Sequence, residues 1–280
     1  MIDLEKITKS PFYEIVCIID ELGQLDLMKH AERIDKRPAM LSHDEYFLNI
    51  RTMLLGIISA ISYMELSVLH IQRRHSKQYF LKSGYIDYDV YKYHYSAFCH
   101  GITTLHDLYF KLVVELCDLK IGSKRMIQWD DLKKTLKSQK EENLINLLEN
   151  FYAIIKVHEQ KRNKVSHEGL LSSPLLDNYY CTHIWTNNAS PKNSEDNTCL
   201  EYTEGTKENK YLLRKTKKEI ISELTTLINQ SINCTLLLFE QLLPKVINKV
   251  SEEFINSHLQ FLKRINNKSI NKYILTRVEE

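Results

Sequence analysis

Residues 157–169 read Val157-His158-Glu159-Gln160-Lys161-Arg162-Asn163-Lys164-Val165-Ser166-His167-Glu168-Gly169, and this stretch decides how the chain folds. Upstream of it, residues at helical spacing predict one buried stripe, made of Leu144, Leu147, Leu148, Phe151, Ile154, Ile155 and His158. Gly169 is suited to end that helix. The stripe then reaches Arg162, and arginine is almost never buried unpaired. Either Arg162 and His167 cap the end of a helical bundle, or they converge on a ligand.

The composition predicts an all-α protein. Of 280 residues, 43% are hydrophobic, which is enough for a large core, while only 7 are glycine and 5 are proline. The net charge of +2 excludes global basicity, so binding of a polyanion would need a local patch. The six cysteines show no metal-ligand spacing and fit a reducing cytosol, and the acidic N-terminus does not resemble a signal peptide. We therefore expect a cytoplasmic protein with no metal site.

The pattern of apolar residues predicts a single domain over residues 1–280 with a core over 43–169. Helices are expected over about 10–35, 43–73, 89–119 and 141–162, from about Lys217 onward, and over 252–264, so that C-terminal helices fill 211–265. Ser10 and Pro11 are expected to begin the first helix, and Pro244 to kink or break the long C-terminal one. The region between 124 and 140 reads as a polar connector. Residues 171–210 are expected to form an irregular insert, with a possible hairpin at 179–185.

The second predicted helix has two notable features. Its middle, residues 53–61, is apolar, but the run is too short for a membrane span and charged residues bracket it, so a core helix is expected and no membrane partner. Its end carries the cations Arg73 and Arg74, with His70, His75 and Lys77. These complement the dipole at a helix C-terminus, and a phosphate-binding patch is the alternative.

The third predicted helix has an apolar stripe and a separate polar face. Leu105, Leu108, Leu112 and Leu116 form the stripe, joined by Tyr109 and Val113. His100, Thr104, Asp107 and Lys111 recur on the polar face. A face in contact with solvent is the first interpretation, and the lining of a shared cleft is the second.

Arg162 and His167, with Asn163 directly after the arginine, resemble the signature of the HEPN-domain ribonucleases, which are helical RNA-cutting domains of prokaryotic toxins and antiviral systems. The layout of helices over residues 46–169 is similar to the Cthe-2314-like branch of that family. The first forty residues and those after Pro174 are covered by the resemblance weakly or not at all. One departure is Gly169. HEPN toxins whose antitoxin is a nucleotidyltransferase carry tyrosine there, so the resemblance does not imply such an antitoxin.

The resemblance implies an up-and-down helical bundle and a metal-independent endoribonuclease without a cofactor. In it, the 2′-hydroxyl of RNA attacks the adjacent phosphate. By this resemblance Arg162 stabilises the transition state, His167 transfers protons, and Asn163 orients the phosphate or His167. These roles suit a permanently charged guanidinium and an imidazole that titrates near neutral pH. The resemblance also implies Asp107 or His106 as an accessory group, and His158 is expected to be a core histidine more than a catalyst.

The implied partners are RNA, a second copy of the chain in a homodimer, and an antitoxin or defence-system protein. Weak RNA contacts are expected from Lys161, Lys164, Arg73 and Arg74. Two other functions stay open at this point. One is a catalytically silent HEPN-like module that binds RNA, a nucleotide or a partner protein. The other is a helical scaffold in which Arg162 and His167 only cap the bundle.

Overall fold

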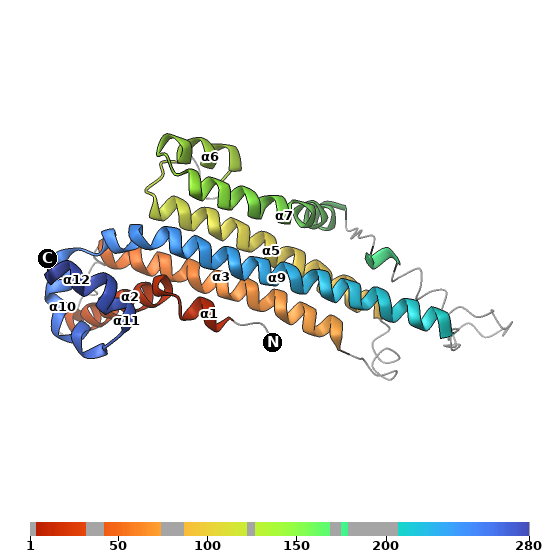
Figure 1. The fold of residues 1–280 in the computed structure, drawn as a ribbon, viewed down its shortest axis with the longest axis horizontal. Helices are drawn as coiled ribbons and strands as arrows, with labels where there is room; N and C mark the ends of the chain where they lie inside the picture. The colour runs from red at the N-terminus through yellow and green to blue at the C-terminus, as the bar shows by residue number, and fades with distance from the viewer. Residues whose placement is uncertain are drawn as a thin grey trace. The chain divides into compact units, whose positions relative to one another are not determined.

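The protein is all-α. A computed structural model describes residues 4–31, 42–73, 87–121, 127–168, 175–178 and 207–279, and within them it contains helices and no strand. The long helices are α2 (Pro11–Ala31), α3 (Ser42–Gln72), α5 (Asp87–Leu116), α7 (Glu142–Glu168) and α9 (Lys207–Lys249) (Figure 1). The shorter ones are α1 (Glu5–Thr8), α6 (Trp129–Ser138), α10 (Glu252–Ile265), α11 (Lys268–Ile270), the π-helical η1 (Asn271–Leu275) and α12 (Thr276–Glu279).

Contacts divide the chain into two compact units. Unit 1 comprises residues 1–60, 104–154 and 231–280, and unit 2 comprises residues 61–103 and 155–230. Unit 1 holds α1, α2, α6 and α10 to α12 whole, and parts of α3, α5, α7 and α9. Unit 2 is built from the remaining parts of those four helices. This division does not test the prediction of a single domain over residues 1–280.

The core of unit 1 is held by large apolar side chains and a few buried polar contacts. Phe12 of α2 stacks on Phe239 of α9 with ring centroids 4.6 Å apart. The hydroxyl of Tyr109 on α5 contacts Thr235 Oγ1 at 2.5 Å and donates to the Ser231 carbonyl at 3.1 Å, so α5 and α9 are joined inside the core. Gly56 allows α3 to approach α5 closely, because a Cβ there would lie 3.1 Å from a methyl carbon of Leu108.

A buried ion pair joins α2 to α3 in unit 1. Asp20, whose side chain is 2% exposed, accepts hydrogen bonds from Arg51 Nη1 at 2.5 Å and from Gln24 Nε2 at 2.7 Å. The α2 helix itself begins as the sequence predicts, since the Ser10 hydroxyl accepts a hydrogen bond from the Tyr13 amide, with Pro11 at the first helical position.

The structure corrects several expectations about the helices. The connector before residue 140 contains α6, which buries Leu132 and Leu136, one turn apart, and has Asp130 and Asp131 in its first turn. Helix α7 continues six residues beyond 162 and ends at Glu168, directly before Gly169, the residue suited to end it. Helix α9 begins ten residues before Lys217 and continues through Pro244, so of the expected kink or break the helix shows no break. The insert predicted over 171–210 has a helical turn at 175–178 and the start of α9 at 207–210, while the rest of it, including 179–185, lies outside the described residues.

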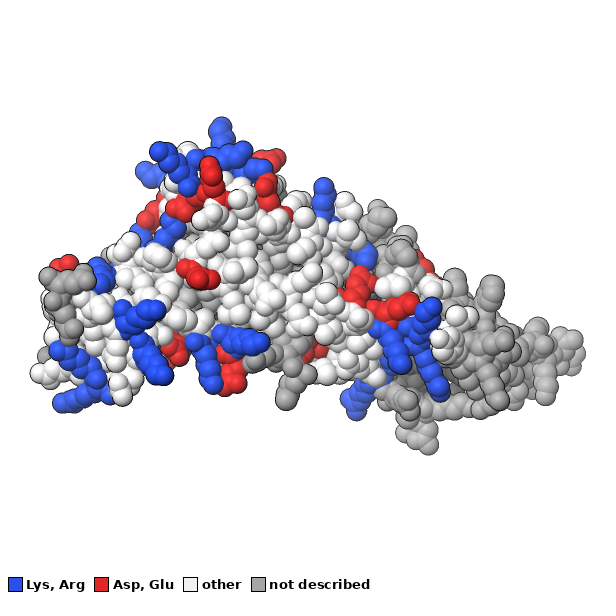
Figure 2. All heavy atoms as spheres, viewed as in Figure 1, with Lys and Arg blue, Asp and Glu red and all other residues white. Residues whose placement is uncertain are grey.

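Charged side chains are unevenly spread. Figure 2 shows lysines and arginines gathered over α6, whose sequence holds Lys133, Lys134 and Lys137.

Helix α3 is long and apolar. By length and composition alone, residues 46–72 would suffice to cross a membrane, but the core helix of a soluble protein passes the same test. Its inner face is core, with Phe47, Ile50, Leu54, Ile57, Ile61 and Met64 all buried.

Candidate functional site

The C-terminal part of α7 belongs to unit 2, and its residues follow two helical registers, one with buried and one with exposed side chains. Ile155 and His158 are buried, and position 162 follows one turn later in that register. Val157, which is 54% exposed, and Gln160 are exposed, and positions 164 and 167 continue their register. The motif therefore lies wholly within a helix, with position 162 on the inner register and position 167 on the outer one. Asn163 is exposed, and the side chains of Arg162, Lys164 and His167 lie outside the described part of the structure.

His158 is a core residue, as its place on the stripe predicts. It is 4% exposed and packs between Tyr95 and Phe98 of α5, with ring centroids 6.5 Å and 6.3 Å away. Its Nδ1 lies 3.9 Å from the Sγ of Cys99. Burial, and to a lesser extent the charge of Lys161, lowers the pKa of His158 to about 4, while burial raises the pKa of Cys99 to about 12. Both groups are therefore neutral at pH 7, and they do not form the thiolate–imidazolium pair of a cysteine nucleophile.

The lowered pKa of His158 predicts a pH dependence of stability. A group whose folded pKa lies below its unfolded pKa contributes stability that is fully present above the unfolded pKa and is lost as pH falls. For His158 the window runs from about 6.5 down to 4. Between about pH 7 and 4.5, protonation of His158 in the unfolded chain should lower the unfolding free energy of the wild type by about 2 kcal/mol. We expect the His158→Gln variant to lack this part of the decrease. Urea unfolding at both pH values measures it, and an unchanged pH slope in the variant would contradict it.

Lys161 is held by α5. Its Nζ donates a hydrogen bond to the Tyr95 hydroxyl at 2.6 Å and lies 5.0 Å from the centroid of the same ring. Tyr95 is fully buried. The ammonium group thus anchors the turn before Arg162 to α5. The RNA contact expected of Lys161 from the sequence stays a prediction.

We expect the Lys161–Tyr95 contact to be measurable. Tyr95→Phe removes the hydroxyl and keeps the ring, so it should lower the unfolding free energy by about 1.5–3 kcal/mol, as for other hydrogen bonds to charged groups. Thermal or urea unfolding beside Tyr211→Phe, whose parent side chain is 67% exposed, provides the comparison. Equal stability of the two variants would show that the contact contributes nothing.

The candidate residues on α5 differ from one another. His106 is buried against Phe110 and Tyr152, with ring centroids 4.0 Å and 5.2 Å away, and its Nε2 has no hydrogen-bond partner among the described atoms. Asp107 is exposed and its carboxylate lies 3.8 Å from His106 Nδ1. His100 and Thr104 are also exposed, which favours the solvent-facing interpretation of this polar face. His106 and Asp107 belong to unit 1, whereas the α7 motif belongs to unit 2.

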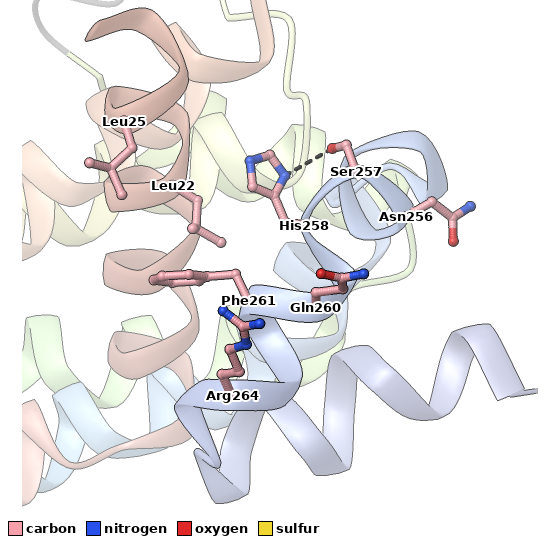
Figure 3. Close-up of a pocket in the computed structure, with 8 residues that line it drawn as sticks. All are labelled: Leu22, Leu25, Asn256, Ser257, His258, Gln260, Phe261 and Arg264. Atoms are coloured by element: carbon pink, nitrogen blue, oxygen red, sulfur yellow. Dashed lines mark hydrogen bonds between the residues drawn. The ribbon is translucent and has the colours of Figure 1, made fainter. Parts of the chain in front are cut away.

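The other features considered for a site are the two arginines after α3, clusters of metal-ligating side chains, and a pocket in unit 1. Arg73 is exposed at the end of α3, and Arg74 lies outside the described residues. No cluster of three or more histidine, cysteine, aspartate or glutamate side chains suited to a metal ion occurs in the described ranges. A pocket of about 530 Å³ in unit 1 lies between α2 and α10 (Figure 3). Its His258 Nδ1 contacts Ser257 Oγ and the Phe254 carbonyl, both at 2.9 Å, and it contains none of the motif residues.

Sequence reasoning missed Tyr95 and Cys99 as neighbours of the motif helix. Tyr91 and Tyr95 lie within the helix predicted over 89–119, outside the apolar stripe assigned to it, yet both are buried in α5. The signal was the spacing of Tyr91, Tyr95, Phe98 and Ile102, which repeats at four, three and four residues. Comparison with known proteins returned no matching family model, no matching curated protein and no matching solved structure.

Proposed function

We propose that this protein is a metal-independent endoribonuclease of the HEPN type that acts in the cytoplasm as a toxin or antiviral effector. The observation that supports it is the place of the motif on α7. Positions 162, 163 and 167 lie on the last two turns of one helix, directly after a residue, Lys161, that is fixed to the neighbouring helix. Residues on a supported helix can be held in the geometry that catalysis needs.

The proposed reaction needs no group from outside the protein and the RNA. The 2′-hydroxyl attacks the adjacent phosphorus, and the 5′-oxygen of the next nucleotide leaves. His167 transfers protons in this reaction: the attacking 2′-hydroxyl loses one and the leaving 5′-oxygen gains one. Arg162 neutralises charge on the pentavalent phosphorane. Asn163, which is exposed, orients the phosphate or His167. His158 supports the helix from the core and takes no part in proton transfer near pH 7, because its pKa is about 4.

The proposal includes a homodimer, because one arginine and one histidine make an incomplete site. The outer register of α7 supports this arrangement, since Val157 and Gln160 are exposed and positions 164 and 167 continue their register. A symmetric dimer that buries this register would bring two copies of His167 together. An antitoxin or defence-system protein remains a proposed further partner.

One observation favours a second function. Position 162 continues the buried register of Ile155 and His158, which also fits an arginine that caps the bundle. In that case the chain is a helical module that binds RNA or a protein without cutting RNA.

The test uses purified protein and total RNA. We expect RNA to be cut equally with and without EDTA and to carry 2′,3′-cyclic phosphate ends, because the nucleophile is the RNA's own hydroxyl. Cleavage that EDTA stops, or ends bearing a 5′-phosphate, would reject the proposal. A protein that binds RNA and leaves it whole, while remaining dimeric, would support the silent module instead.

A further inference from the structure

A run of aromatic and imidazole rings lies on the surface of unit 2. Tyr63 of α3 is 66% exposed and Tyr93 of α5 is 70% exposed, although tyrosine usually buries most of its ring. On α3, Tyr63, Leu66 and His70 are spaced three and four residues apart, so they lie along one face of the helix. Leu66 is 48% exposed and His70 is half-buried.

The run continues from α3 onto α5. The rings of His70 and His94 are parallel within 1° with centroids 4.5 Å apart. The ring of Tyr93 meets that of His94 edge to face at 5.2 Å. Tyr63, Leu66, His70, His94 and Tyr93 therefore make one surface with contributions from two helices, which we term the ring surface.

The charge beside the ring surface is positive at one end. Arg73 is exposed and follows His70 by three residues, so it lies on the same face of α3. The sequence after it continues with Arg74, His75 and Lys77. Two acidic residues lie nearby in the helices, Glu65 on α3 and Asp89, one turn before Tyr93 on α5.

We infer that the ring surface binds single-stranded RNA, with bases stacked on Tyr63 and Tyr93 and a phosphate paired with Arg73. This inference rests on the proposed function and names the form of RNA that the enzyme takes. Unpaired bases stack on exposed aromatic side chains irrespective of sequence, and arginine pairs with the backbone between them. Bases inside a duplex have no free face, so the surface selects unpaired RNA.

Charge complementarity favours RNA over a second copy of the chain. The middle of a protein–protein interface is usually depleted of charge, whereas a nucleic-acid surface sets cations beside its rings. Here the exposed cation Arg73 lies at the end of the ring surface. The same unit carries the α7 motif, so bound RNA and the proposed catalytic residues belong to one compact unit.

The test measures binding of a fluorescent oligouridylate by anisotropy, in the full-length chain carrying His167→Ala so that the RNA stays whole. We expect Tyr63→Ala with Tyr93→Ala to weaken binding at least about tenfold, from the loss of two stacking positions. Phenylalanine at both positions should keep the affinity, because stacking needs the ring and not the hydroxyl. Tyr211→Ala is the matched control, since Tyr211 is 67% exposed and has no described ring contact with this surface. Arg73→Ala should reduce the dependence of affinity on salt.

Three results would overturn the inference. The first is a double alanine variant that binds RNA as tightly as the Tyr211 control. The second is equal affinity for single-stranded and duplex RNA. The third is loss of dimers in sedimentation when the two tyrosines are changed, which would identify the surface as a contact between copies. The cleavage assay separates this inference from the proposed function: if His167→Ala still cuts RNA while the tyrosine variants lose binding, the ribonuclease mechanism fails and the RNA surface stands.

Discussion

Replacing His167 with alanine should lower the rate of RNA cleavage by about 10²–10⁴, the usual cost of losing a proton-transfer group. Replacing Arg162 should cost roughly 10²–10³, as for other preorganised charges that act on a transition state. Both variants should lose toxicity on expression. The measurement is the initial rate of cleavage of one labelled RNA, with product ends analysed for the cyclic phosphate.

The thermal transition distinguishes catalysis from structure. Position 167 continues the register of Val157 and Gln160 and not the buried stripe of α7, so its loss removes no core packing within the subunit and should leave the unfolding midpoint nearly unchanged. His100→Ala is the matched control, because His100 is an exposed histidine on α5 of the same unit. If His167→Ala cuts RNA as fast as His100→Ala does, the proposed mechanism is wrong. If Arg162→Ala and His167→Ala both unfold, these residues cap the bundle.

Arg51→Ala should destabilise the fold by about 3 kcal/mol. The side chain of Asp20 is 2% exposed and accepts hydrogen bonds from Arg51 and Gln24, so removing the guanidinium strands a carboxylate inside the protein. Breaking one side of a buried pair typically costs about 3–5 kcal/mol, and the 26% exposure of Arg51 places this case at the lower end. Urea unfolding at pH 7 measures the change.

The double variant Asp20→Asn with Arg51→Ala tests the reason for that loss. Without the carboxylate no buried charge is left unpaired, so the double variant should be more stable than Arg51→Ala alone. Equal or lower stability would show that Arg51 acts through the packing of its alkyl chain. Arg73→Ala, an exposed arginine at the end of the same helix, should leave the free energy of unfolding almost unchanged.

The helices were predictable where apolar residues repeat over several turns. The all-α class, the Ser10–Pro11 start of α2 and the bounds of α10 within one residue follow from such local signals. Helix α6 was missed because its lysines outnumber its two buried leucines. Helix α9 passes Pro244 because the proline is exposed and the carbonyl four residues earlier belongs to exposed Glu240, where water can replace the lost hydrogen bond.

The site was predictable only in part. Spacing placed Arg162 and His158 on the inner side of α7 and His167 beyond the stripe, and the burial of His158 is confirmed. Ile154, which spacing also placed on the stripe, is 36% exposed at its edge. The role of Lys161 could not be inferred, because its partner Tyr95 is 66 residues away and a pairing between two helices leaves no local pattern. The roles of Arg162, Asn163 and His167 remain predictions.

Three buried cysteines have thiols that react slowly while the protein is folded. Burial raises the pKa of Cys99 to about 12, of Cys117 to about 11 and of Cys234 to about 12. The thiolate is the form that attacks alkylating reagents and peroxides, so these three side chains react slowly while the helices stay packed. Their rate of labelling by iodoacetamide, read peptide by peptide, thus reports how often each part of the bundle opens, without any inserted probe.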